Sequence, residues 1–266
     1  MANEKNTLGF QTVKWAEQHS ARRWRKIKFY VGSLDELTGG GINSRGIVEI
    51  AGEAGSGKTQ LSLHLSLSSQ FQHHTEGMEK GVVFISTEHP FPSRRLMQMH
   101  ERFATKYDAS NVKTINFTDN IFLENVNSST LLEQCILQRL PVLLKNNPIG
   151  LIVIDSITAA YAAEQNYVDR AHSFRKVVHA LYLLQEQFDL AVVCTNQVRS
   201  LIDSSTLGDE KIIPALGLAW SSLVHTRLQL SRTQGTNARV CRLLFSPTAA
   251  ASECHFVITE QGISDS

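Results

Sequence analysis

The sequence predicts an α/β fold: a mostly parallel central sheet with helices on both faces and an antiparallel C-terminal extension. Three observations support this prediction. Apolar runs of strand length recur at 81–86, 151–154 and 190–195, as expected of strands buried on both faces of a parallel sheet. Segments with apolar residues at helical spacing lie between these runs. Beyond residue 223, β-prone segments follow one another across polar turns, which favours antiparallel strands.

Length and composition fit one large α/β domain or two small ones. The chain has 266 residues, of which 42% are hydrophobic and 19% charged, so a sizeable core is expected. Its net charge is +1, so any DNA contact must come from local patches rather than a general basic field. The four cysteines form no C-x-x-C pair, which suits a reducing compartment. Neither a signal peptide nor 18 continuous apolar residues are present, so we expect a soluble chain.

We divide the chain into an N-terminal arm, residues 1–30, and a domain over residues 31–266. The arm holds a short apolar patch at 8–13 and a basic run at 21–28 that Trp24 interrupts. This run fits either a nucleic-acid or import patch or a solvated linker face, and the sequence leaves both open. A short helix is expected at 34–37, ended by the glycines that follow it.

Residues 52–59 read Gly-Glu-Ala-Gly-Ser-Gly-Lys-Thr and fit the phosphate-binding loop G-x-x-x-x-G-K-[ST]. A strand-prone segment precedes them and a helix-prone segment follows, which is the context that this loop requires. The glycines let backbone N–H groups turn inward, and the helix N-terminus adds partial positive charge. We expect Lys58 to reach the β- and γ-phosphates and Thr59 to coordinate Mg²⁺. The expected nucleotide-binding residues of this segment are Gly52, Glu53, Ala54, Gly55, Ser56, Gly57, Lys58, Thr59 and Gln60.

Polar side chains follow three of the predicted strands. Glu88 comes after the strand at 81–86, Asp155 ends the strand at 151–155, and Gln197 follows the strand at 190–195. The carboxyl ends of parallel strands border the crevice where ligands bind. Asp155 has the form of a Walker B acid and joins the expected nucleotide-binding residues, holding Mg²⁺ together with Thr59. Gln197 either contacts the γ-phosphate or is a surface amide. ATP and Mg²⁺ are the expected cofactors.

The remaining elements follow from periodicity. We predict helices at 93–104, 128–145 and 173–188, with Pro141 breaking or kinking the second. Strands are expected at 224–231, 238–245 and 255–259, and a polar, mobile loop at 199–211. His73 and His74 lack metal-ligand spacing, and we assign both to the surface.

Several of these stretches together resemble the RecA-type strand-exchange ATPases, the family of the eukaryotic recombinase and its paralogues. The resemblance is carried by residues 9–13, 52–60, 86–88, 151–156, 195–198 and 214–217. Residues 84–96, 140–144 and 254–258 look most like one of the paralogues, and residues 214–220 like a second. The resemblance implies a RecA-like P-loop ATPase domain over 31–266 and an oligomerisation tether within 1–30.

The resemblance also implies roles for single residues. Glu88 corresponds to the carboxylate that polarises the attacking water, and Gln197 to the residue that senses the γ-phosphate; with Lys58 they are the expected catalytic residues. Phe10 and Val13 fall on the family's F-x-x-A tether, which plugs pockets on a neighbouring subunit. The segments 162–169 and 199–211 correspond to its two DNA-facing loops.

Two departures from the family pattern favour an accessory paralogue. Val13 stands where the family pattern has an alanine, whose methyl group fills a pocket on the neighbouring subunit. The second DNA-facing loop carries the acids Asp203, Asp209 and Glu210 against Arg199 and Lys211. Binding to a phosphate backbone needs a surplus of positive charge, which this loop does not supply. Both facts argue against an autonomous strand-exchange enzyme.

Three hypotheses follow. The first is a DNA-dependent ATPase paralogue of the recombinase, acting in the nucleus in homologous recombination and double-strand break repair, mitotic, meiotic or both. Its partners would be other paralogues or the recombinase, reached through Phe10, with DNA bound through the complex and no membrane involved. The second is a non-catalytic assembly subunit whose nucleotide is structural. The third is an unrelated phosphate-loop enzyme such as a small-molecule kinase, although no acceptor-binding segment is obvious.

Overall fold

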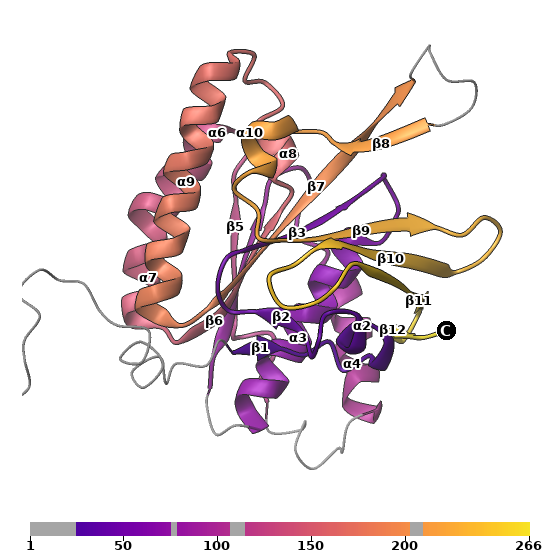
Figure 1. Ribbon diagram of the computed structural model, residues 1–266. Helices are drawn as coiled ribbons and strands as arrows, with labels where there is room; N and C mark the ends of the chain where they lie inside the picture. The colour runs from indigo at the N-terminus through magenta and orange to yellow at the C-terminus, as the bar shows by residue number, and fades with distance from the viewer. Residues whose placement is uncertain (1–24, 76–78, 107–114, 203–209) are drawn as a thin grey trace, which may run out of the picture.

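A ten-stranded sheet forms the centre of the molecule (Figure 1), with the strand order β12-β11-β10-β9-β3-β7-β6-β4-β5 and β8 paired with β7. The computed structural model describes residues 25–75, 79–106, 115–202 and 210–266. The strands from β9 to β5 are parallel, whereas β10, β11 and β12 extend the sheet in antiparallel fashion. The strands are β3 (Ile47–Gly52), β4 (Gly81–Ser86), β5 (Ile121–Asn125), β6 (Ile149–Asp155), β7 (Ala191–Ile202), β8 (Glu210–Pro214), β9 (Thr226–Arg232), β10 (Ala238–Phe245), β11 (Ser252–Thr259) and β12 (Gly262–Asp265).

Helices cover both faces of this sheet, and alternate residues of the parallel strands β3, β4, β6 and β7 point into one of two apolar cores. Val48 and Ile50 of β3 enter the first core, whereas Ile47 enters the second. The first core is covered by α2 (Gly32–Leu37), α3 (Lys58–Thr75) and α4 (Ser93–Lys106). The second is covered by α6 (Ser129–Gln134), the π-helix η1 (Cys135–Arg139), α7 (Leu140–Asn146), α8 (Ile157–Ala160), α9 (Tyr167–Phe188) and α10 (Gly217–Ser221). The predicted α/β class, with helices on both faces and an antiparallel C-terminal extension, is confirmed.

Two predicted segments differ in detail. The helix expected at 128–145 contains a π-helical turn just before Pro141, where a proline lacks the N–H that the preceding turn would use. The loop expected at 199–211 is partly regular: β7 continues to Ile202 and β8 returns beside it, so that the pair projects from the body of the molecule (Figure 1). The segment 162–169, which we expect to be a DNA-facing loop, is only partly a loop, because Asn166 caps α9 and residues 167–169 form its first turn.

The assignment of His73 to the surface is wrong. Its side chain is buried on α3, packed where a side chain at Gly150 would stand, 2.2 Å from the position of a Cβ there. Glycine at 150 therefore leaves the space that the imidazole ring fills. The sequence did not predict this burial, because α3 is buried around most of its circumference and polar residues such as His73 are buried with the apolar ones.

The N-terminal segment joins the domain before its first helix. β1 (Lys26–Ile27) pairs with β2 (Ile42–Asn43) in a small separate sheet, and Phe29 is fully buried in the first core. Phe10, Val13, Asp203 and Asp209 lie outside the described residues, so the tether stays a prediction. The division of the chain at residue 30 also stays a prediction. Within the described part of the chain, no helix combines the length and the apolar character that crossing a membrane requires.

Candidate functional site

The predicted phosphate-binding loop joins the carboxyl end of β3 to the amino end of α3. The Lys58 ammonium folds back over the loop and donates hydrogen bonds to the carbonyl oxygens of Gly52 and Glu53, each at 2.8 Å. Gly57 has a φ of +107°, and a Cβ there would lie 2.6 Å from Cδ1 of Ile258. Only glycine fits this backbone conformation and this contact. The amine of Lys58 therefore lies against the loop and is bonded to its backbone.

A line of oxygen atoms connects the start of α3 to the tips of β6 and β7. The Thr59 hydroxyl donates a hydrogen bond to Oδ2 of Asp155 at 2.7 Å, and the Thr195 hydroxyl donates to Oδ1 at 2.5 Å. Asp155 is thus fixed from both sides by hydroxyl groups. A carboxylate and a hydroxyl at hydrogen-bond distance form a set of hard oxygen donors of the kind that Mg²⁺ prefers. The donor set fits the ion that the sequence predicts.

Lys58 lies within the electrostatic reach of three carboxylates. Burial lowers the pKa of its ammonium, while the negative charges of Asp155, Glu88 and Glu53 act in the opposite direction. These acids come from β6, from the segment after β4 and from the loop itself. The phosphate-binding loop and the strand tips therefore bring the predicted amine and acids into one charged cluster at the same edge of the sheet.

Glu88 and Gln197 also come together. The side-chain amide of Gln197 donates to Oε2 of Glu88 at 3.5 Å, and Nε2 of His89 lies 3.8 Å from Oε1 of the same carboxylate. The Glu88 side chain is 46% exposed, so water reaches it. The backbone N–H of Gln197 donates to the Thr158 hydroxyl at 2.8 Å, which fixes the chain just before the β7–β8 hairpin. Gln197 is therefore half-buried and directed at Glu88, rather than a free surface amide.

A buried network that the sequence analysis missed lies behind the site. The Glu49 carboxylate is fully buried and accepts hydrogen bonds from the Asn196 amide at 2.6 Å, from the Trp220 indole at 2.7 Å and from Arg227. Asn196 in turn accepts a 2.5 Å hydrogen bond from the Thr158 hydroxyl, which holds Gln197. A charged residue within the apolar run at 47–51 was the available signal in the sequence.

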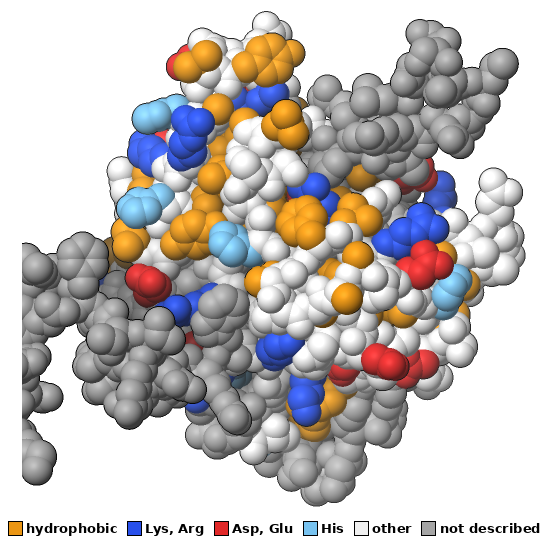
Figure 2. All heavy atoms as spheres, in the orientation of Figure 1, with side chains coloured by type: hydrophobic (Ala, Val, Ile, Leu, Met, Phe, Trp, Pro, Cys, Tyr) orange, Lys and Arg blue, Asp and Glu red, His pale blue; other side chains and the backbone are white. Residues whose placement is uncertain are grey.

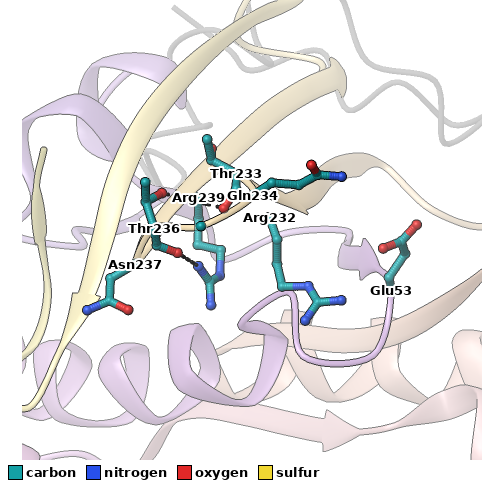
Figure 3. Close-up of a pocket in the computed structure, with 8 residues that line it drawn as sticks. Glu53, Arg232, Thr233, Gln234, Thr236, Asn237 and Arg239 are labelled. Carbon is teal, nitrogen blue, oxygen red and sulfur yellow. Dashed lines mark hydrogen bonds between the residues drawn. The ribbon is translucent and has the colours of Figure 1, made fainter.

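A polar cavity of about 540 Å³ lies beside the phosphate-binding loop. Figure 3 shows Arg232 and Arg239 extending from the β9–β10 hairpin toward the loop, with Glu53 on the far side. Nη1 of Arg232 lies 3.5 Å from the position that a Cβ on Gly55 would take. The hairpin therefore adds positive charge next to the loop, which the sequence analysis did not assign because hairpin and loop are far apart in the chain.

An apolar groove of about 410 Å³ lies at the other end of the sheet, between edge strand β5 and the helices η1 and α7. Leu123 and Val142 line it with 54% and 60% of their surfaces exposed. Arg139 and Glu124 form a 3.3 Å ion pair at the same groove. Within the described residues, no strand pairs with the outer edge of β5. The groove and this edge together form a surface with exposed apolar side chains and with backbone groups that no described strand pairs with.

Charge on the visible face of the molecule is dispersed. Figure 2 shows Lys, Arg and His side chains most densely over α9, where His172, Arg175, Lys176 and His179 are exposed. Elsewhere on this face they alternate with apolar and neutral side chains. The described residues contain no cluster of three or more His, Cys, Asp or Glu suited to a metal ion, so a metal at Asp155 needs further oxygen atoms from ligand or water.

Comparison with known proteins places the chain among its relatives. The family model described as Rad51 matches residues 22–266. The DNA repair protein XRCC3 of Mus musculus is 32% identical over 275 residues, covering 95% of this chain and 77% of the relative. The Bos taurus protein of the same name is 33% identical over 267 residues with the same coverage. The DNA repair protein XRCC3 homolog of Arabidopsis thaliana is 32% identical over 285 residues, covering 90% and 92%.

These relatives agree with the resemblance seen in the sequence. The third X-ray repair cross-complementing paralogue, abbreviated XRCC3, is the one that residues 84–96, 140–144 and 254–258 resemble. Residues 214–220 resemble a second paralogue, the "C" paralogue of the recombinase. An unrelated phosphate-loop enzyme is thereby excluded. The family match over most of the chain and the three relatives above 30% identity show that this chain belongs to the Rad51 family.

Proposed function

We propose that this chain is an ATP-binding, DNA-dependent ATPase paralogue of the strand-exchange recombinase. It acts in the nucleus, in homologous recombination and double-strand break repair, as one subunit of a paralogue complex. The observation that carries the proposal is the cluster of Lys58, Thr59, Asp155 and Glu88, drawn from three elements to one edge of the sheet. The names of the XRCC3 relatives support the role in DNA repair.

Each residue of the cluster has a distinct task in this proposal. Lys58 exchanges its carbonyl partners for phosphate oxygens, while Thr59 and Asp155 hold Mg²⁺, which would neutralise phosphate charge when bound. Thr195 keeps the Asp155 carboxylate in orientation. Glu88 accepts a proton from the attacking water, and exposure to solvent suits it to that task.

The test is the Lys58→Ala variant. It removes charge-assisted hydrogen bonds to phosphate, which are worth about 1.5–3 kcal/mol, so ATP should bind roughly 10- to 100-fold more weakly. Isothermal titration of the purified protein measures this change. Lys145→Ala removes an exposed lysine of α7 and serves as the control, with unchanged affinity. ATP binding as tight as that of the wild type in Lys58→Ala would overturn the assignment of the site.

A second candidate function is a non-catalytic assembly subunit, and the groove beside β5 favours it. In that case bound nucleotide stabilises the fold, and docking is the function. Turnover by the purified complex separates the two. If this subunit hydrolyses ATP, Glu88→Gln should lower the rate about 100-fold or more, because the variant lacks the general base. An unchanged rate would leave the subunit with an assembly role alone.

Partner binding is proposed to use two surfaces. The arm within residues 1–30 carries Phe10, which enters a pocket on a neighbouring subunit. Its last residues, from Lys26, are anchored to the ATPase domain of residues 31–266. The groove on this chain accepts an apolar anchor from another subunit, and the edge of β5, with which no described strand pairs, accepts its backbone. DNA is contacted through the complex, since the net charge of this chain is only +1.

A further inference from the structure

Two of the four cysteines face each other across neighbouring strands. Cys241 of β10 and Cys254 of β11 are direct partners in the antiparallel register. Directly opposed residues have Cα atoms about 4.5–5.5 Å apart, which lies within the range of about 4.4–6.8 Å found across disulfides. Both thiols are free, and a hydrogen bond joins their side chains. A bond between the two sulfur atoms therefore needs side-chain rotation and little movement of the backbone.

The surroundings give the two thiols different properties. Cys241 is fully buried in the first apolar core, whereas Cys254 is half-buried at its margin. The hydrogen bond from Cys241 lowers the pKa of the Cys254 thiol, and a second from Ser33 acts in the same direction against burial and the charge of Asp265. The same hydrogen bond and burial raise the pKa of Cys241. Cys254 is thus the accessible nucleophile, and Cys241 is the thiol behind it.

We propose that Cys254 and Cys241 form a reversible disulfide when the chain meets a hydroperoxide. The Cys254 thiolate attacks the outer peroxide oxygen; the O–O bond breaks, the leaving hydroxide or alkoxide takes up a proton, and Cys254 becomes a sulfenic acid. The Cys241 sulfur then attacks the Cys254 sulfur, releasing hydroxide, which combines with the Cys241 proton as water. The peroxide is reduced by two electrons, and a dithiol reductant restores both thiols.

The other two cysteines do not share this arrangement. Cys135 and Cys194 lie in the second core, on the opposite face of the sheet, and burial raises the pKa of both thiols. A bond from either to Cys241 or Cys254 would have to cross the sheet. The modification site is therefore confined to one cross-strand pair.

The position of the pair connects it to the phosphate-binding loop. Ile258 lies four residues after Cys254 on the same strand and the same face, and its side chain packs against Gly57. A bond between β10 and β11 would stiffen the strand that supports this glycine. The proposal does not depend on ATP turnover, so it can fail or succeed independently of the proposed function.

The experiment uses the full chain, reduced and then freed of reductant. Brief treatment with a small excess of hydrogen peroxide is followed by blocking of the remaining thiols and mass spectrometry. Two of the four thiols should disappear, in a single linkage between the Cys241 and Cys254 peptides, and dithiothreitol should restore them. Cys254→Ser should abolish the linkage, whereas Cys135→Ser should leave it intact.

The mapping on the wild-type chain needs no variant, so the proposal can be overturned even if Cys254→Ser does not fold. Retention of all four thiols in the folded chain would overturn it. So would a sulfinic acid at Cys254 without the linkage, or a bond between two chains in place of the internal one. Peroxide-treated wild-type protein should also melt at a higher temperature than the reduced form, because the cross-link restricts the unfolded chain.

Discussion

At the residue scale, Glu49 is the buried charge on which the region behind the site depends. Its carboxylate accepts from Asn196, Trp220 and Arg227, and none of these groups is open to water. Glu49→Gln keeps the shape of the side chain but leaves the Arg227 guanidinium without a counter-charge. We expect the free energy of unfolding to fall by about 3–5 kcal/mol, the cost of breaking a buried ion pair from one side. Urea denaturation followed by circular dichroism measures it.

The matched control is Glu253→Gln. Glu253 pairs with Arg242 on the surface, and both side chains are about half exposed. Water replaces the lost partner there, so no measurable change in stability is expected. If both substitutions changed the free energy of unfolding equally, burial of the Glu49–Arg227 pair would contribute nothing beyond what a surface pair contributes.

Single residues were predictable from the sequence where the motif is local. Lys58 and Thr59 follow from eight consecutive residues, and Asp155 and Glu88 follow from their positions at strand ends. Thr195 could not be assigned, because its contact with Asp155 depends on the pairing of β6 with β7. Arg232 reaches the loop only because β9 lies beside β3, a neighbour far away in the chain.

At the scale of elements, we propose that the surface formed by β5, η1 and α7 binds a partner subunit. Val142 on α7 is 60% exposed and lines the groove. We expect Val142→Asp to reduce co-purification of partner subunits at least tenfold, because a charge placed in an apolar contact must be desolvated on binding. Affinity purification from cells, with quantified partner subunits, measures this loss.

Leu183→Asp serves as the control for this surface. Leu183 lies on α9 with 53% of its surface exposed and does not line the groove. It should leave the partner yield unchanged, and the far-ultraviolet circular dichroism of both variants should match that of the wild type. A full partner yield from Val142→Asp would mean that docking uses a different face.

Elements were predictable where one pattern dominates a segment. The buried strands and α9 follow from apolar runs and helical spacing. The extension of β7 to Ile202 could not be predicted in this way. Its outer half carries no apolar run, and it forms a strand because it pairs with β8. The π-helical turn before Pro141 could be foreseen only as an interruption, because several backbone solutions absorb a proline.

At the scale of the whole molecule, His73 makes stability depend on pH. Burial lowers its pKa to about 4; the positive charges of Lys80 and Arg25 act in the same direction, and Asp189 opposes them. In the unfolded chain the pKa is about 6.5, so between about pH 6.5 and 4 the unfolded state binds a proton that the folded state rejects. The free energy of unfolding should fall as the pH drops through this window, by up to about 3 kcal/mol.

Denaturation at pH 7 and pH 5 checks the sign and the size of this effect. His73→Gln should lose less stability than the wild type between these two values, because its side chain does not titrate. His179→Gln, at an exposed position of α9, should keep the wild-type dependence. An identical pH dependence in all three proteins would exclude His73 as its source.

The overall architecture was predictable as a class, and its strand order was not. Apolar runs indicate that strands are buried and parallel, but they do not say which strands are neighbours. The order in which β3 lies between β7 and β9 arises from pairing between residues well over 100 positions apart. That order places the phosphate-binding loop near the middle of the sheet and leaves β5 at its end.

The outer side of β5 has a consequence for handling the protein. Its backbone groups face outward beside exposed Leu123, and no described strand covers them. Such an edge is a template for indiscriminate association with any extended polypeptide. When the chain is produced without partner subunits, we therefore expect it to aggregate and to be degraded quickly. Balanced co-expression, rather than refolding of a single subunit, is the expected route to well-dispersed material.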